Sequence, residues 1–223
     1  MSVKSNQDIT KKIWMGFVAF ASVGVCILTW QVFVAGETIY EGIEIVMPHM
    51  LGQINASAFS FYIHFIFAPL ALLVMPFQFW AGIRRKSLGL HRWLGRAYVI
   101  AVLVGGVGGM LMSFNTESAH ITAVGFGILA FLWIYTTVRA YMAIRNKDIN
   151  EHKRWMLRSA SLTFGAVTLR VMVPLGQMLD EAGLVPFEYV YTFTAWHWGV
   201  ILPLVEWWII RNWPYRDARK QAA

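Results

Sequence analysis

A motif that combines histidine, tryptophan and arginine occurs twice in the sequence. The first copy contains His91, Trp93 and Arg96, and the second contains His152, Trp155 and Arg158. The two histidines are 61 positions apart (152 − 91), and each copy lies between two long apolar runs. Imidazole nitrogens bind iron and exchange protons near neutral pH. A histidine repeated at one depth of a membrane therefore predicts ligand or proton chemistry at that depth.

Three other histidines and one arginine fall inside apolar runs or at their ends. They are His64, His120, His197 and Arg170. Ionisable side chains inside a membrane span are costly and usually face a bundle interior. His64, Arg170 and His197 have comparable predicted depths, so we expect that they can meet. Arg170 and Glu206 differ in depth by roughly 15 Å, so we do not expect them to pair.

Six apolar runs are long enough to position these side chains in a membrane. They are residues 13–35, 57–82, 93–114, 119–142, 156–179 and 188–210. A helix needs about 20 residues to cross roughly 30 Å of hydrocarbon, and the runs lack the alternation of barrel strands. The chain has 57% hydrophobic and only 14% charged residues. It is predicted to be an all-α integral membrane protein, with one transmembrane domain over residues 1–223.

The repeated motif predicts two related helical hairpins, 57–115 and 119–179. Helical hairpins pair into four-helix bundles whose facing helices can hold a cofactor. Spans two to five are therefore expected to form a central four-helix bundle with its core at residues 57–175. The first and sixth spans would flank this bundle, and residues 36–56 are expected to form a loop on the outer side.

The basic residues that flank the spans all fall on one side of the predicted membrane. The three loops on the other side contain acidic residues but no Lys or Arg. Because basic loops stay in the cytoplasm, the sequence predicts a multi-pass protein of a bacterial inner membrane with both termini in the cytoplasm. This topology accounts for the net charge of +7. The lipid bilayer is therefore an expected partner, and nucleic acid is not.

Spans two to five carry one of four histidines each, and alternate spans carry them toward the same side. His64 and His120 lie toward the outside, whereas His91 and His152 lie toward the inside. Each pair is predicted to bind haem b through two imidazoles, a ligation chemistry that proteins tune by burial and hydrogen bonds. Two such haems would carry electrons across the membrane, from a quinol or small reductant at one face.

Four further side chains belong to this predicted haem site. Guanidinium groups suit carboxylates, so Arg96 and Arg158 are expected to meet haem propionates at the inner site. Arg170 would do so further out, and His197 is an alternative outer iron ligand.

Four glycines occur close together in span three, at Gly105, Gly106, Gly108 and Gly109. Small residues at this spacing favour close packing between membrane helices. A functional interpretation is that they clear room for a flat ring near the level of His64.

Both motifs, together with His64, Gln78-Phe79, Trp133 and Leu169-Arg170, resemble the bacterial membrane-protein family catalogued as domain of unknown function 2306. This resemblance covers about residues 57–175 and implies little about function. The histidine placement is also similar to cytochrome b561-type proteins, in which helices two and four hold one haem and helices three and five another. His91, His120 and His152 depart from that pattern because they stand at helix starts, whereas that family's ligands lie within the helices.

Other functional classes stay open. The chain contains no CxxCH haem attachment, Walker motif or HExxH sequence, and whether it is an enzyme is left open. A second interpretation of the chain is a non-catalytic subunit or assembly factor of a larger membrane complex. In that case the two motifs would bind a partner protein or anionic lipid head groups. A third interpretation is a small transporter or quinone-binding protein with His64, Arg170 and His197 as its polar centre. The motifs are equally typical of simple anchors at a membrane boundary.

Overall fold

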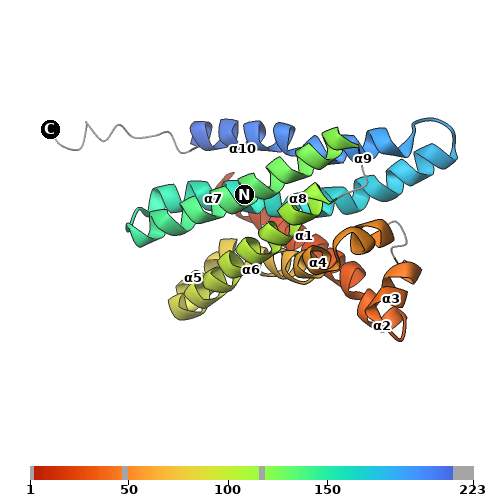
Figure 1. Ribbon diagram of the computed structural model, residues 1–223. Helices are drawn as coiled ribbons and strands as arrows, with labels where there is room; N and C mark the ends of the chain where they lie inside the picture. Colours follow the sequence, from red (N-terminus) through yellow and green to blue (C-terminus); the bar gives the residue numbers. More distant parts are fainter. Residues whose placement is uncertain (1–2, 47–49, 116–118, 213–223) are drawn as a thin grey trace.

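The computed structural model describes residues 3–46, 50–115 and 119–212, and its elements are α-helices (Figure 1). In chain order they are α1 (Val3–Trp30), α2 (Val32–Ala35), α3 (Ile39–Val46), α4 (Leu51–Phe79), α5 (Ala81–Lys86), α6 (Leu88–Phe114), α7 (His120–Arg145), α8 (Ile149–Glu181), α9 (Phe187–Trp196) and α10 (Trp198–Asn212). Within these described residues there is no β-strand. The predicted all-α class is therefore confirmed.

Five stretches of helix are long and apolar enough to cross a membrane. They are Lys12–Ala35, Leu51–Phe79, Leu88–Phe114, His120–Arg145 and Ile149–Glu181. The sixth predicted span is instead divided at His197 into α9, of 10 residues, and α10, of 15 residues. Neither piece alone reaches the roughly 20 residues that one crossing needs. The predicted count of six membrane-spanning helices is therefore not confirmed, because the sixth span is interrupted at His197.

The helices that carry the repeated motif begin earlier than the apolar runs. Helix α6 begins at Leu88, and the Ser87 side chain caps it by accepting a hydrogen bond from the backbone N–H of Leu90 at 3.2 Å. Helix α8 begins at Ile149 after Asp148, which accepts from the N–H of Glu151 at 2.9 Å. Such caps satisfy backbone donors that the helix leaves unpaired. His91 and His152 therefore lie in the first turn of each helix rather than before it.

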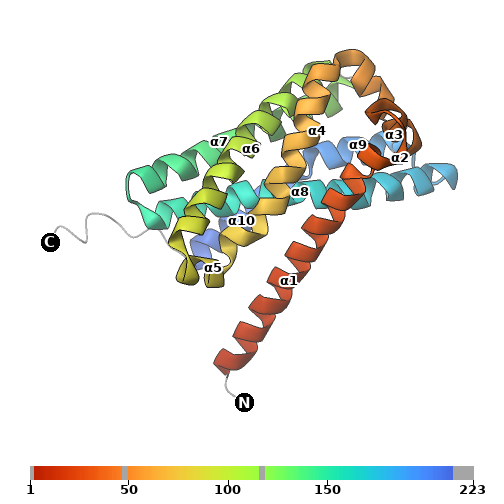
Figure 2. The same cartoon turned by 90° about the horizontal axis from the view of Figure 1, so that it is seen from below.

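Contacts between α4, α6, α7 and α8 run around a closed ring. Helix α6 packs most extensively against α4 and also contacts α7, α7 packs against α8, and α8 returns to contact α4. Helix α1 contacts α4 and α8, and α9 and α10 lie along α8 (Figures 1 and 2). In this ring α4 lies diagonally opposite α7, and α6 lies diagonally opposite α8.

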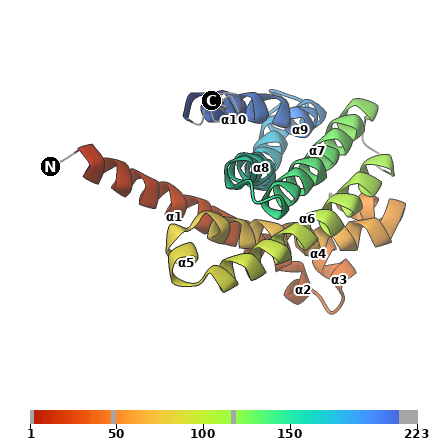
Figure 3. The same ribbon diagram turned by 90° about the vertical axis from the view of Figure 1, so that its left-hand side faces the viewer.

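Two segments extend from this ring. The N-terminal half of α1 points away from the other helices (Figure 3), and its Ile13 and Trp14 side chains are exposed. The predicted outer loop 36–56 contains α3, whose Ile43 is buried together with Val32 of α2. Helix α4 starts within this loop, at Leu51, and has non-helical backbone dihedrals at Ser57 (φ −163°, ψ 87°). The predicted boundary at residue 57 is therefore a kink and not a helix start.

The connections gather at two ends of the molecule (Figure 1). Helix α5, the α7–α8 connection and the end of α10 lie at one end, which we call the basic end. Its cations are Arg84, Arg85, Lys86, Arg145, Lys147, Lys153 and Arg211. Helices α2 and α3 and the α8–α9 connection lie at the other, acidic end. Its carboxylates are Glu37, Glu41, Glu44, Asp180, Glu181 and Glu188.

Candidate functional site

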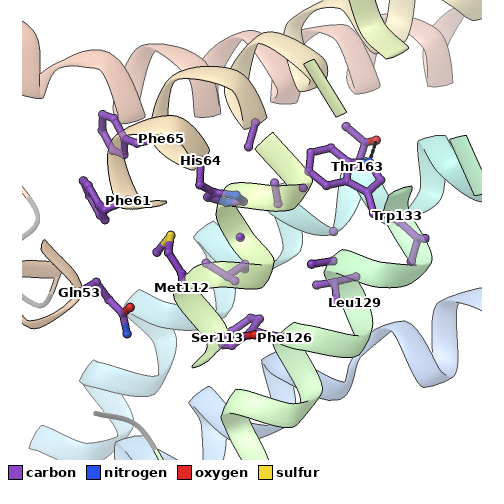
Figure 4. A pocket seen from close by; sticks show the side chains of 18 of the residues that line it. Gln53, Phe61, His64, Phe65, Met112, Ser113, Phe126, Leu129, Trp133 and Thr163 are labelled. Carbon is purple, nitrogen blue, oxygen red and sulfur yellow. Dashed lines mark hydrogen bonds between the residues drawn. The ribbon is translucent and has the colours of Figure 1, made fainter. Parts of the chain in front are cut away.

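A cavity of about 210 Å³ lies among α4, α6, α7, α8 and the α9–α10 junction. Its walls are mostly apolar, and the side chains of Phe61, Met112, Leu129 and Trp133 face it (Figure 4). Its polar lining comes from Gln53, His64, Ser113, Thr163, Arg170, Tyr191 and His197. Ligand sites are commonly apolar pockets with a few convergent polar groups. This cavity is therefore the candidate functional site, and it brings His64, Arg170 and His197 together as their predicted depths indicate.

His64 is held against α6 by glycines. Its Nδ1 lies 2.8 Å from the carbonyl oxygen of Gly105, and a Cβ on Gly109 would lie 2.8 Å from the same nitrogen. A Cβ on Gly108 would lie 2.8 Å from the backbone nitrogen of His64. The flat ring for which these glycines make room is thus the imidazole itself. No described residue hydrogen-bonds to Nε2 of His64.

His197 occupies the break between α9 and α10. Its Nδ1 is hydrogen-bonded to the carbonyl of Thr194, and a Cβ on Gly165 of α8 would collide with its Nε2. The side chain is buried, with 5% of its surface exposed. Pro203 has no N–H to donate to the carbonyl of Gly199, which weakens the helix just after the break. The junction of α9 and α10 thus places a second imidazole in the wall of the cavity.

Arg170 reaches the cavity from α8. Its Nη2 donates a hydrogen bond to Thr29 Oγ1 on α1 at 3.2 Å. Its Nε is buried and has no hydrogen-bond partner among the described residues. The guanidinium lies close enough to His64 and Tyr191 for electrostatic interaction with both. A buried donor without an acceptor is costly, so Arg170 is positioned to receive an acceptor from a ligand.

Three of the histidines share one hydrogen-bonding arrangement. Nδ1 of His64, His152 and His197 lies against a backbone carbonyl, that of Gly105, Ala140 and Thr194 respectively. A carbonyl accepts only, so each Nδ1 carries a proton, and the neutral form of each ring has its lone pair at Nε2. Histidines that ligate metals are commonly oriented by such a bond, and the same lone pair accepts a hydroxyl proton.

His120 does not join this group. It is the first residue of α7, it is exposed, and it does not line the cavity that contains His64. The predicted pairing of His64 with His120 therefore has no support in the geometry, whereas His197 occupies the place of the alternative outer ligand. The physical reason is that a helix end faces the membrane boundary, while a cavity lies deeper.

His91 and His152 approach each other near the basic end. They are close enough to interact electrostatically, and Nδ1 of His152 lies 2.9 Å from the carbonyl oxygen of Ala140. Nδ1 of His91 is buried and has no partner among the described residues. The predicted inner pair is therefore brought together, on diagonally opposite helices.

Arg96 and Arg158, which were predicted to meet haem propionates beside this pair, differ in their surroundings. Arg96 is exposed. Arg158 donates from Nε and Nη2 to Oε2 of Glu206 at 2.9 and 2.6 Å, and its guanidinium stacks 4.4 Å from the centre of the Trp155 ring. A carboxylate therefore already neutralises Arg158, which argues against its predicted role at a propionate.

A buried hydroxyl network beneath the cavity was not predicted. The Tyr98 hydroxyl lies 2.7 Å from both Ser159 Oγ and Thr163 Oγ1, and Thr137 Oγ1 lies 2.6 Å from Ser159 Oγ. Trp133 Nε1 donates to Thr163 Oγ1 at 2.8 Å. The sequence offers one signal for it, since Tyr98 and Ser159 are 61 positions apart, like the two motif histidines. Thr163 and Trp133 also line the cavity, so the network forms its floor and ties α6, α7 and α8 together.

The fold and the site define an all-α membrane protein with a polar cavity in an apolar helix assembly. The chain belongs to the family described as predicted membrane protein (DUF2306), whose model matches residues 61–210. No curated protein and no solved structure matches the chain. The family resemblance is thus confirmed, and the resemblance to cytochrome b561-type proteins stays a prediction. Among the described residues, no group of three or more His, Cys, Asp or Glu side chains is arranged to hold a metal ion.

Proposed function

We propose that this protein binds the head group of a quinone-type molecule in the cavity between α4, α6, α7, α8 and the α9–α10 junction. The proposal rests on one observation: a hydrogen-bond donor and a hydrogen-bond acceptor that are available to a ligand line the same apolar cavity. The Nε–H of Arg170 lacks an acceptor, and Nε2 of His64 lacks a donor, among the described residues. A quinone ring is flat and apolar, with oxygens at opposite edges, so it matches both the walls and the two polar groups.

One ring oxygen would be bound by a hydrogen-bond acceptor of the protein and the other by a hydrogen-bond donor. His64, with its Nδ1–H bonded to the Gly105 carbonyl, accepts the hydroxyl hydrogen of a quinol at Nε2. Arg170 donates to the other oxygen from Nε–H. His197 adds a second imidazole, fixed by its bond to the Thr194 carbonyl. His64 favours the reduced quinol, whose hydroxyl donates to Nε2, whereas Arg170 can donate to the second oxygen whether that oxygen is a hydroxyl or a carbonyl.

Variants of the cavity test this proposal. His64→Ala and Arg170→Gln are each expected to weaken the binding of a short-chain quinol about tenfold or more, because each removes one buried hydrogen bond to the ligand. The measurement is equilibrium binding of the labelled quinol to the purified protein in detergent. His120→Ala is the matched control, because His120 is exposed and lies outside the cavity, and it should bind like the wild type. Unchanged affinity in both cavity variants would rule out this site.

Haem b is a second candidate, favoured by the Nδ1–carbonyl bonds of three histidines. His64 and His197 would hold the iron in the cavity, Arg170 would meet a propionate, and His91 and His152 would form the inner pair. A bound haem supplies one-electron transfer. The donor types fit, but a volume of about 210 Å³ is below the roughly 300–1,000 Å³ of pockets for drug-sized ligands, so a smaller ring fits better. A reduced-minus-oxidised haem band in the purified protein would favour haem over quinone.

The proposed topology has six crossings, with α9 and α10 forming one crossing broken at His197. It is supported by the path of the chain, because α10 runs back to the basic end, where α5 also lies, after α8 has run to the acidic end (Figure 1). By the positive-inside rule the basic end faces the cytoplasm of a bacterial inner membrane, with both termini on that side.

Single cysteines introduced into a Cys26→Ala background test this topology. A membrane-impermeant maleimide added to intact cells should label Glu188→Cys. Lys147→Cys and Arg211→Cys should react only after permeabilisation, because basic connections are retained inside. Labelling of Arg211→Cys from outside, with Lys147→Cys protected, would mean five crossings instead of six.

A further inference from the structure

The turn between α4 and α6 encloses a second hollow, separate from the polar cavity. It has a volume of about 310 Å³ and is lined by Trp80, Gly82, Ile83, Lys86, Ser87 and Leu90. Its surface is mostly apolar, and Lys86 and Ser87 are the polar residues that line it. The neighbouring Arg84 and Arg85 are exposed. We call this hollow with Arg84, Arg85 and Lys86 the α5 site.

The positive charge of the α5 site has no carboxylate to balance it. The sequence contains no Asp or Glu between Glu44 and Glu117. Among the described residues, no carboxylate forms an ion pair with Arg84, Arg85 or Lys86. The positive-inside rule explains on which side these cations lie, but not why this connection lacks every acidic partner.

The second copy of the motif is built differently. In the α7–α8 connection, Asp148 caps α8, and Glu151 pairs with Arg154 at 2.6 Å. The two connections are repeats of each other, yet only the second contains carboxylates, Asp148 and Glu151, among its cations. An external anion is therefore expected at the first connection rather than the second.

The apolar surface around the α5 site indicates what kind of anion. Trp80, Leu88, Leu90 and Trp93 are all exposed beside the cations, at a connection between two membrane-spanning helices. A soluble anion leaves such apolar side chains in water, whereas a phospholipid covers them with its glycerol and acyl chain. Basic residues next to a membrane span attract anionic lipids.

We propose that the α5 site binds the head group of an anionic phospholipid. Arg84, Arg85 and Lys86 contact the phosphate, and Trp80, Ile83 and Leu90 contact the apolar part of the lipid. The role of this lipid is to fix the α4–α6 hairpin at the membrane surface. The proposal is independent of what the polar cavity binds.

Lipid retention by the full-length protein tests the proposal. The protein is purified with a mixture of phosphatidylglycerol and phosphatidylcholine, and the lipids that stay bound are counted by native mass spectrometry. The wild type is expected to prefer phosphatidylglycerol on the order of tenfold. The triple variant Arg84→Gln/Arg85→Gln/Lys86→Gln should lose most of this preference.

The repeat supplies a matched control that removes the same charge. Arg145→Gln/Lys147→Gln/Lys153→Gln lies at the second connection and should keep the preference of the wild type. An equal loss in both triple variants, or no preference in the wild type, overturns the proposal, because only general charge attraction would then operate. Equal competition by free glycerol phosphate also overturns it, since the site would then recognise a soluble anion. A thermal unfolding curve for each variant verifies that it is folded.

Discussion

Glu206→Ala is expected to lower the free energy of unfolding by about 2–3 kcal/mol. The Arg158 guanidinium, with 9% of its side chain exposed, would lose both hydrogen bonds to Glu206. Removing one member of a buried ion pair costs more than the pair contributes. Glu206 is 38% exposed, which is why the expected loss lies below that for a fully buried pair.

The size of the loss in stability differs between the two partners. Arg158→Leu should be less harmful than Glu206→Ala, because the carboxylate it leaves behind is the more exposed member. The double variant Arg158→Leu/Glu206→Leu should recover most of the lost stability, since an apolar pair of similar size often replaces a buried ion pair without loss.

Unfolding of the purified protein in mixed micelles, titrated with a denaturing detergent, measures these differences. Glu188→Ala is the control, because it removes the same charge from an exposed side chain that forms no ion pair among the described residues. Equal stability of Glu206→Ala and Glu188→Ala would show that the Arg158–Glu206 pair does not hold α8 and α10 together.

Depth was predictable from the sequence, because the rise of a helix depends only on residue number. This is why His64, Arg170 and His197 were expected to meet, and they line one cavity. The same counting places Arg158 and Glu206 at similar depth, nine residues after the start of α8 (158 − 149) and six before the end of α10 (212 − 206). The Arg158–Glu206 pair could therefore have been predicted from the sequence.

Rotation about the helix axes was not predictable. In lipid both the packed and the exposed faces of a helix are apolar, so the pattern that reveals the buried face in soluble proteins is weak. The network of Tyr98, Ser159 and Thr163 depends on such rotation. Helix rotation also determines that His197, and not His120, lines the cavity together with His64.

Gly108→Ala is expected to lower the free energy of unfolding by about 1–3 kcal/mol, although alanine normally favours a helix. The new Cβ would lie 2.8 Å from the backbone nitrogen of His64 and 2.9 Å from the carbonyl oxygen of Ser60. Backbone atoms of α4 cannot rotate out of the way as a side chain can, so α4 and α6 must move apart. Their contact is the most extensive between helices of the described structure.

Gly24→Ala on α1 is the matched control, because no atom lies within 4 Å of the position of its Cβ. It should keep or slightly raise stability, so a loss at Gly108 alone identifies close helix packing as the cause. The separation of α4 from α6 also lengthens the bond from His64 Nδ1 to the Gly105 carbonyl, which is 2.8 Å in the wild type. Gly108→Ala should therefore weaken quinol binding together with stability, whereas Gly24→Ala should change neither. Stability lost without any change in binding would separate the glycine packing from the orientation of His64.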